Sequence, residues 1–489
     1  MILLKDCFRV VRTHYGSGQF ASTTGVASNT GGAGTSGAGT SGAASSADDD
    51  LSGVDILIDG KRIRKISKGI PAPEGCVVVD ASRHVVMPGL VNTHHHFYQT
   101  LTRNIPAVQD AKLFKWLVYL YEIWKGVDEE AVYWSSKLAL AELAKTGCTL
   151  TTDHHYLYPQ GFKEDLPGLQ FKAASEIGLR FAPTRGSMSR SRKDGGLPPD
   201  TVVQDEDTIL AESEAALKKY HDKAPDAMRK LALAPCSPFS VSERSMKDAA
   251  ALARRHGARL HTHLAETLDE DDFCVKMYGR RPLRVMQDCD FVGPDVWYAH
   301  GIHFNDEELK ILAETGTGVA HCPSSNMRLG SGICRVREML DLGVPVSLAV
   351  DGSASNDASD MLGEARQALL LQRVRYGAAG ITAREVLGLA TIGGARILGY
   401  DQAGLMEEGA LADLALFDVM KMEYAGALSD PAAALLFSGY NHGVDHLVVN
   451  GEFVVRDRRL VGADEETIRV EANRCAKALL EKAGVKAEW

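Results

Sequence analysis

Apolar runs of strand length alternate with longer amphipathic segments between about Pro88 and Tyr400. Two of the longer segments, DEEAVYWSSKLALAELAKTG and SERSMKDAAALARRHG, predict helices, the second with Ser242 as its N-cap and Gly257 as its stop. The strand-like runs are CTLTTDHH, LRFAPTRGS, LALAPCSPFS, ARLHTHLAE, VWYAHGIHF, GVAHCPSSN and PVSLAVDGS. At ~40 residues per strand-helix unit, the stretch predicts an α/β fold, a (β/α)8 barrel of the TIM type. A doubly wound open sheet is the alternative, but no Gly-x-Gly-x-x-Gly follows an early strand.

Both ends of the chain show the alternation of apolar and polar residues that is typical of strands. MILLKDCFRVVRTH and VDILIDGKRIRKIS lie at the start, and the second contains an Asp59-Gly60 turn. ALADLALFDV and VDHLVVNGEFVVRDRRLV lie at the end, where Asn450-Gly451 is a strong hairpin signal. We therefore expect a small β-sandwich domain built from residues 1–87 and 405–489, beside a catalytic barrel at 88–404.

The segment from Gly16 to Gly53 consists almost entirely of Gly, Ser, Thr, Ala and Asp. Such a composition cannot bury enough apolar surface to offset the entropy that ordering would cost. We expect residues 16–53 to form a flexible surface insertion within the first β unit.

Composition narrows the choice of partners. Of the 489 residues, 45% are hydrophobic and 24% are charged, as in an ordinary globular protein, and the formal net charge is −10. That charge argues against nucleic acid or an anionic membrane as the main partner, and no run approaches the ~18 apolar residues of a membrane helix. Nine scattered cysteines without a Cys-x-x-Cys pair predict reduced thiols in a cytoplasmic protein.

Chemically capable side chains stand at the end of nearly every apolar run. In a barrel these positions are the C-terminal strand ends, where active sites are built. Surface histidines placed at random would not collect there. The residues are His94, His96, His154, His155, His263, Glu266, His300, His321 and Asp351.

The run NTHHHFYQT could be a polar tract, a metal chelator or part of a catalytic centre. Side chains alternate sides along a strand, so His94 and His96 point one way and His95 points away. Two imidazoles at i and i+2 can chelate a borderline metal such as Zn²⁺. His261 and His263 repeat this spacing, although only one of them need be a ligand.

Two acids complete the candidate site. Asp351 ends an apolar run, where a lone buried carboxylate would be costly and a cation would remove that cost. An N-cap or turn role for Asp351 is the alternative. Glu266 follows His263 by three residues, which suits a proton carrier better than a ligand. The acidic run from Asp269 to Asp272 is interpreted as a solvated face.

The motifs PGLVNTHHHFYQTLTR, HTHLAETLDEDDFC, YAHGIHF, AHCPSSNMRLGSGI and VDGSASNDASDML, in this order, resemble the amidohydrolase superfamily. More narrowly, they are similar to its mononuclear-zinc aminohydrolases, which deaminate heterocycles. The resemblance implies that His94, His96, His263 and Asp351 bind one Zn²⁺ per subunit, with Fe²⁺ tolerated. It implies acid/base catalysis by Glu266, and a role for His300 in holding the attacking water or the substrate.

The same resemblance implies hydrolytic deamination of an amino-substituted N-heterocycle, with 8-oxoguanine, converted to urate and ammonia, as the first expected substrate. An s-triazine of the hydroxyatrazine type and guanine are alternatives, and a non-catalytic scaffold is the alternative outside enzymes. Barrels of this kind are expected to form homo-oligomers, dimers or larger. The candidates for reading the substrate ring are Gln99, Arg185, Tyr156 and His154.

Overall fold

The computed structural model describes residues 1–15, 50–162, 165–439 and 442–487. Residues 16–49, which make up most of the predicted insertion, lie outside the described part. All nine cysteines are free thiols, as the sequence predicts. Within the described residues, no helix is both long and apolar enough to cross a membrane.

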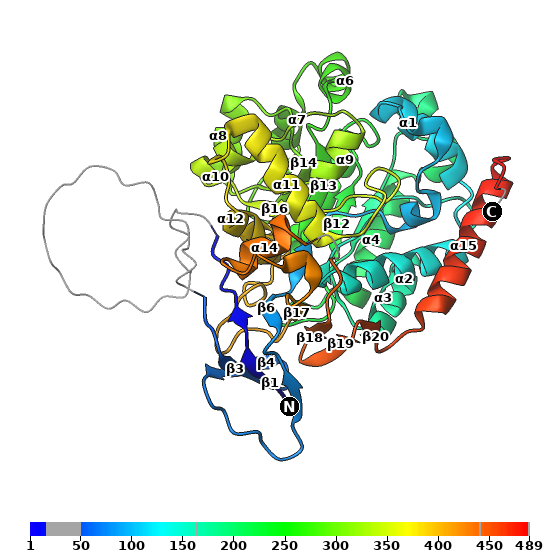
Figure 1. The fold of residues 1–489 in the computed structure, drawn as a ribbon. Coiled ribbons are helices and arrows are strands. Elements are labelled where there is room, and N and C mark those ends of the chain that lie inside the picture. The colour runs from blue at the N-terminus through cyan, green and yellow to red at the C-terminus, as the bar shows by residue number, and fades with distance from the viewer. Residues whose placement is uncertain (16–49, 163–164, 440–441, 488–489) are drawn as a thin grey trace, which may run out of the picture.

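Strands from both ends of the chain form two sheets beside the barrel (Figure 1). The first has the order β4-β3-β1-β5, with β1 at Ile2–Cys7, β3 at Val54–Asp59, β4 at Arg62–Ser67 and β5 at Val77–Asp80. The second has the order β2-β6-β17-β18-β19-β20, with β2 at Arg9–Val10, β6 at His84–Pro88, β17 at Leu414–Asp418, β18 at His446–Val449, β19 at Glu452–Arg456 and β20 at Arg459–Leu460. Buried side chains of both sheets, including Ile56, Val86 and Leu414, share one core.

The predicted turns hold these strands in register. β3 and β4 pair antiparallel with Asp59 opposite Arg62, so this turn consists of Gly60 and Lys61, one residue later than predicted. β18 and β19 pair antiparallel across Asn450-Gly451, as predicted. Asn450 and Gly451 have φ of 53° and 80°, the left-handed values that a two-residue hairpin turn of type I′ requires.

The centre of the chain forms the predicted barrel. Its strands are β7 at Leu90–Asn92, β8 at Cys148–Thr151, β9 at His154–His155, β10 at Arg180–Phe181, β11 at Thr184–Ser187, β12 at Ala232–Pro235, β13 at Leu260–Leu264, β14 at Val296–His300, β15 at Gly318–His321 and β16 at Val346–Leu348. They fall into parallel sheets of order β10-β8-β7 and β16-β15-β14-β13-β12-β11-β9. The third barrel strand is split at Pro183, which has no N–H to donate to a ladder.

Hydrogen bonds join the last barrel strand to the first. Asp351 donates its backbone N–H to His94 O at 3.1 Å, and Val350 donates its own to Asn92 Oδ1 at 3.0 Å. On the other side of the first strand, His154 donates its N–H to His95 O at 2.7 Å. The two parallel sheets therefore enclose one barrel, which confirms the predicted fold class.

The two predicted helices are present, and the second has the predicted ends. α2 spans Glu129–Lys145, and Asp128 caps it by accepting from Ala131 N–H. α5 spans Glu243–His256, with Ser242 as its N-cap and Gly257 in the left-handed conformation as its C-cap. The other helices are α1 Leu113–Trp124, α3 Leu166–Ile177, α4 Glu206–Tyr220, α6 Leu268–Tyr278, α7 Pro282–Asp288, α8 Asp306–Thr315, α9 Pro323–Arg328, α10 Val336–Leu342, α11 Met361–Tyr376, α12 Ala383–Gly388, α13 Gly394–Ile397, α14 Pro431–Phe437 and α15 Glu465–Lys482.

The C-terminal helix α15, red in Figure 1, packs mainly on helices of the barrel, and its Glu465 accepts the backbone N–H of Leu460 in β20. Its Ala476 and Leu479 belong to the same buried cluster as Trp124 of α1 and Ala131 of α2. The C-terminal part of the chain thus contributes both to the sheets and to the wall of the barrel. Inside the barrel, small side chains such as Ala232 and Ala320 surround Trp297 and fill the end opposite the histidines.

Candidate metal centre and active site

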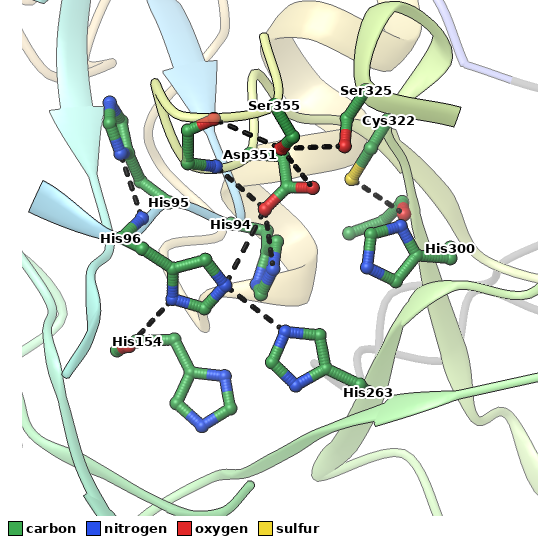
Figure 2. Close-up of polar contacts among 12 residues, drawn as sticks. His94, His95, His96, His154, His263, His300, Cys322, Ser325, Asp351 and Ser355 are labelled. Atoms are coloured by element: carbon green, nitrogen blue, oxygen red, sulfur yellow. Dashed lines mark hydrogen bonds and ion pairs between the residues drawn. The ribbon is translucent and has the colours of Figure 1, made fainter. Parts of the chain in front are cut away.

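Three histidines turn the same ring atom toward one point at the C-terminal end of the barrel (Figure 2). His96 donates from Nδ1 to His154 O at 2.8 Å, and His263 donates from Nδ1 to Cys236 O at 2.7 Å. The Nε2 atoms of His96 and His263 then carry lone pairs, and they face each other at 3.1 Å. Two lone pairs at this distance require a cation between or beside them.

A relay fixes the third ring. His261 donates from Nδ1 to Trp297 O at 2.9 Å, so its Nε2 carries a lone pair that can accept a hydrogen bond. His94 Nδ1 lies 2.7 Å from this Nε2 and is the donor. The proton of His94 is therefore on Nδ1, and its Nε2 keeps a lone pair. That Nε2 is buried and has no hydrogen-bond partner. Metal-binding histidines are held in the same way, by a hydrogen bond at the second ring nitrogen.

Asp351 brings a carboxylate to the same point. Its Oδ1 lies 3.3 Å from His94 Nε2 and 3.5 Å from His96 Nε2. The residue has φ of 65°, a conformation that non-glycine residues rarely adopt. His300 and Ala265 share this feature, with φ of 74° and 56°. Strained backbone of this kind is concentrated at functional sites, where the surrounding structure enforces it.

The protonation states of these groups suit a metal centre. Burial lowers the pKa of His96 and of His263 to about 4 and that of His94 well below its ordinary value, so the three rings are neutral at pH 7. Burial acts to raise the pKa of Asp351, but its contact with His94 outweighs burial, and that pKa lies well below the usual range. Three neutral imidazoles and one carboxylate are donors of the kind that can bind a divalent metal ion such as zinc.

Glu266 stands beside this cluster. Its Oε2 lies 3.5 Å from His300 Nε2, and its side chain is buried. Burial, with Asp351 and Glu270 nearby, raises the pKa of Glu266 well above its ordinary value. A carboxyl group with a raised pKa at the metal centre can exchange protons near neutral pH, as a general acid/base must.

His300 points toward the same region from the end of β14. Asn326 donates from Nδ2 to His300 Nδ1 at 3.0 Å, which leaves the proton of His300 on Nε2. Burial lowers the pKa of His300 to about 4, so the ring is a neutral donor at pH 7. Asn326 is not among the site residues predicted above; its position in the AHCPSSN motif is the signal that could have linked it to His300.

A pocket opens above the cluster. Gln99 and Tyr156, two of the predicted ring readers, line it together with His96, His263, Glu266, His300 and Asp351. Gln99 Oε1 accepts from Ala354 N–H at 3.4 Å and passes so close to Gly352 that any Cβ there would lie 1.9 Å from it. Gly352 is thus required for Gln99 to reach the pocket.

The other wall of the pocket was not predicted. Leu113, Trp116, Leu117 and Tyr121 line it from one side of α1, and Cys236 and Phe239 line it from the loop after β12. Trp116 is buried, and its Nε1–H has no hydrogen-bond partner. The apolar spacing of α1 is typical of any packed helix, so the sequence carried no sign that this face covers the metal centre.

Two of the four predicted ring readers do not line the pocket. Arg185 pairs in register with His155 and faces outward, where it binds Glu212 at 2.6 Å and lies over the Tyr158 ring at 3.9 Å. Because the strand is interrupted at Pro183, the alternation of side chains along it could not be followed from the sequence as far as Arg185. His154 lies within the barrel, stacked on His263 with ring centroids 4.8 Å apart, and donates from Nε2 to Ala234 O. Its ring lies close enough to His94, His96 and His263 to belong to the same group of possible metal ligands, and its buried Nδ1 has no hydrogen-bond partner.

The acidic run after Glu266 is only partly solvated. Asp269 and Asp272 are exposed, but Glu270 is 0% exposed and Asp271 is 7% exposed. The expectation of a solvated face was therefore wrong for two of the four residues. α6 begins at Leu268 and turns Glu270 back toward the end of β13, where it accepts from two backbone N–H groups.

A parallel barrel with histidines and a carboxylate at its C-terminal strand ends defines a metal-dependent enzyme of the TIM-barrel class. Residues 85–454 match the family model described as the amidohydrolase family. The chain belongs to the amidohydrolase family. This confirms the family that the sequence motifs indicated.

Comparisons with known proteins agree with this family assignment. The chain is 48% identical to 8-oxoguanine deaminase from Pseudomonas aeruginosa over 88% of this chain and 96% of that protein. It is 40% identical to isoxanthopterin deaminase from an unknown prokaryotic organism over 88% of this chain and 92% of that protein. Among solved structures, the atrazine chlorohydrolase TrzN from Arthrobacter aurescens TC1, complexed with zinc, superposes with a TM-score of 0.86 at 28% identity. That superposition covers 97% of this chain and 100% of TrzN.

Proposed function

We propose that the protein catalyses the hydrolytic deamination of 8-oxoguanine, in which 8-oxoguanine and water give urate and ammonia. The observation that carries the proposal is the meeting of three imidazole Nε2 atoms, the Asp351 carboxylate and Glu266 under one pocket. The similarity to 8-oxoguanine deaminase over almost the whole chain supports the choice of substrate.

His94, His96 and His263 would hold one Zn²⁺ ion through Nε2, together with the carboxylate of Asp351. The unpartnered Nε2 of His94 and the facing Nε2 atoms of His96 and His263 fit a cation of this kind. When bound, Zn²⁺ lowers the pKa of a water to about 7. Similar ligand sets tolerate Fe²⁺, and metal analysis of the purified protein decides between the two ions.

The side chains around this centre supply the proton transfers. Glu266, with its raised pKa, takes a proton from the attacking water and passes it to the ring nitrogen beside the amino-bearing carbon. His300 donates from Nε2 and holds the attacking oxygen as the carbon becomes tetrahedral. Glu266 or Asp351 then takes the remaining proton of the attacking oxygen and delivers it to the amino group, so that the C=O bond forms as the C–N bond breaks and ammonia leaves.

The pocket suits a flat heterocycle. Trp116, Leu117 and Phe239 form an apolar wall, and the amide of Gln99 presents a donor and an acceptor to a lactam edge. An s-triazine or guanine would use the same catalytic residues, and the overall similarity to TrzN keeps the triazine as the second candidate. A non-catalytic scaffold would have no use for an intact ligand set. We also propose a homo-oligomer, which light scattering of the purified protein would test.

A substrate panel tests the proposal. Ammonia release is measured with 8-oxoguanine, guanine, isoxanthopterin and hydroxyatrazine, and we expect 8-oxoguanine to give the highest kcat/KM. Glu266→Gln should lower kcat by about 10²- to 10⁴-fold. The exposed Glu307→Gln is the matched control and should leave kcat unchanged. Absence of turnover of 8-oxoguanine by metal-loaded protein would reject this substrate.

A further inference from the structure

A second cavity lies at the N-terminal end of the barrel strands, opposite the metal centre. It has a volume of about 230 Å³ and is enclosed by the starts of β12 and β13, the ends of α4, α5 and α13, and the ring of Trp297. Four basic side chains line it: His221, Lys223, Lys230 and Arg259. No carboxylate from the described residues lines this cavity.

Lys230 and Arg259, which are half-buried, have no carboxylate partner among the described residues, although Lys230 Nζ lies 4.0 Å from the centre of the Tyr400 ring. Arg180, a close neighbour, forms an ion pair with Asp413 at 2.9 Å. By contrast, Lys230 Nζ donates to Gly399 O at 2.5 Å and Arg259 Nη1 donates to Pro294 O at 2.8 Å. Among the described residues, neither has a carboxylate oxygen within ion-pair distance.

The electrostatic result is a positive cavity in an acidic protein. Burial and the nearby Arg259 lower the pKa of Lys230 to about 8, and Asp401 and Asp222 act on it only at longer range. His221 accepts the Leu231 N–H at Nδ1, at 3.0 Å, which leaves its ring proton on Nε2 as a further donor. Several cationic donors that line one cavity are an arrangement suited to phosphate and related oxyanions.

We propose that this cavity binds a small multivalent oxyanion of the phosphate class, held by Lys223, Lys230 and Arg259. Pockets for drug-sized ligands begin at ~300 Å³, and the volume of this cavity is smaller. The cavity therefore suits a small ion such as phosphate better than a nucleotide. Lys223 is exposed at its mouth and can close over the ion.

Trp297 links this cavity to the metal centre. Its ring lines the cavity and stacks on His261, with centroids 4.4 Å apart and an interplanar angle of 16°. His261 in turn contacts His94 Nδ1 at 2.7 Å. Because indole emission responds to nearby charge, Trp297 should report occupancy of the cavity.

Calorimetric titration with inorganic phosphate, in a phosphate-free buffer of matched ionic strength, tests the proposal. We expect saturable binding with one ion per chain, and a weakening of about tenfold or more in Arg259→Gln and in Lys223→Met. Arg255→Gln, an exposed arginine outside the cavity, is the matched control and should bind phosphate as the unchanged protein does. Lys223 is exposed, so Lys223→Met should fold even if Arg259→Gln does not.

Tryptophan fluorescence gives a second readout. The emission should change with phosphate and saturate over the same concentrations, and Trp297→Phe should abolish the change. The proposal is overturned if no saturable heat is seen, or if Arg259→Gln and Lys223→Met bind phosphate as tightly as the unchanged protein. Binding of a nucleoside monophosphate tenfold more tightly than phosphate would overturn the assignment to a small ion. These readouts do not depend on deaminase activity, so failure here is distinct from failure of the proposed function.

Discussion

Glu270 holds the turn that carries Glu266. The two oxygens of its buried carboxylate accept the backbone N–H groups of Ala265 and of Glu266, each at 3.1 Å. Ala265 has φ of 56°, so this clamp stabilises a strained backbone directly before the candidate proton carrier. Glu270 touches neither the pocket nor the metal ligands and acts through Glu266.

The first prediction concerns Glu270→Gln. A glutamine amide can accept with only one oxygen, so one of the two backbone N–H groups loses its partner and the turn relaxes. We expect kcat to fall about 10- to 100-fold, as for a small misplacement of a catalytic group, while metal content stays unchanged. The pH profile of kcat should shift, because the surroundings of Glu266 change. An unchanged profile with unchanged kcat would show that Glu270 does not position Glu266.

The same residue predicts a pH dependence of stability. Burial raises the pKa of Glu270 to about 8 in the folded protein, whereas an unfolded glutamate has a pKa of about 4.3. Between these values the folded state binds more protons, so the free energy of unfolding falls as pH rises. Glu270→Gln should flatten this fall between about pH 4.5 and 8. Urea denaturation at several pH values measures the free energy of unfolding of both proteins. An equal dependence of this free energy on pH in both proteins would contradict the expectation.

The relay from Trp297 through His261 to His94 predicts a loss of metal affinity. In His261→Ala, His94 Nδ1–H loses its acceptor, and the ring is free to rotate or to change tautomer. Loss of such a supporting hydrogen bond typically lowers metal affinity about 10- to 100-fold. Competition with a chelator measures the affinity, and His256→Gln, a histidine on α5 away from the centre, is the control. Equal zinc affinity in His261→Ala and His256→Gln would rule out the relay.

The three consecutive histidines should separate in mutagenesis. His94→Ala and His96→Ala should abolish both metal binding and turnover. His95 lies on the other side, where Nδ1 accepts the His96 N–H at 2.8 Å (Figure 2). Its Nε2 donates to Ser359 Oγ at 3.0 Å. His95→Ala should mainly lower stability, by about 1–3 kcal/mol for the lost buried hydrogen bonds. Thermal unfolding and metal analysis of all three variants test this prediction. Identical behaviour of the three would refute the assignment of His94 and His96 to the metal and of His95 to stability.

The pocket above the metal centre is narrow in this structure. Its volume of about 30 Å³ holds about two water molecules, far less than a bicyclic purine. Leu113, Trp116, Leu117 and Tyr121 of α1 form the apolar wall of the pocket, so α1 should move when substrate enters. In Glu266→Gln, binding of 8-oxoguanine should change hydrogen exchange in residues 113–124 and leave α2 unchanged. Substrate binding without any change in α1 exchange would place the entrance elsewhere.

The local elements of this protein could be predicted because they depend on nearby residues. The caps of α5 at Ser242 and Gly257, and the turn at Asn450-Gly451, follow from side-chain and backbone preferences at single positions. The strand-end placement of His94, His263 and Asp351 follows from where the apolar runs stop. The family motifs added the assignment of roles, which spacing alone left open between His261 and His263.

Only the tertiary structure decided which side chains meet. Arg185 faces away from the pocket because β11 pairs in register with β9 after a break at Pro183, and no local pattern encodes that register. Glu270 is buried because α6 turns back onto the end of β13, although its sequence neighbours are acidic. α1 and α15 pack together across more than 300 residues of sequence. Sequence thus determined the strands, the helix ends and the candidate ligands, whose energetics are local. Pairing register, burial and the wall of the pocket arise from long-range packing, which spacing along the chain does not record.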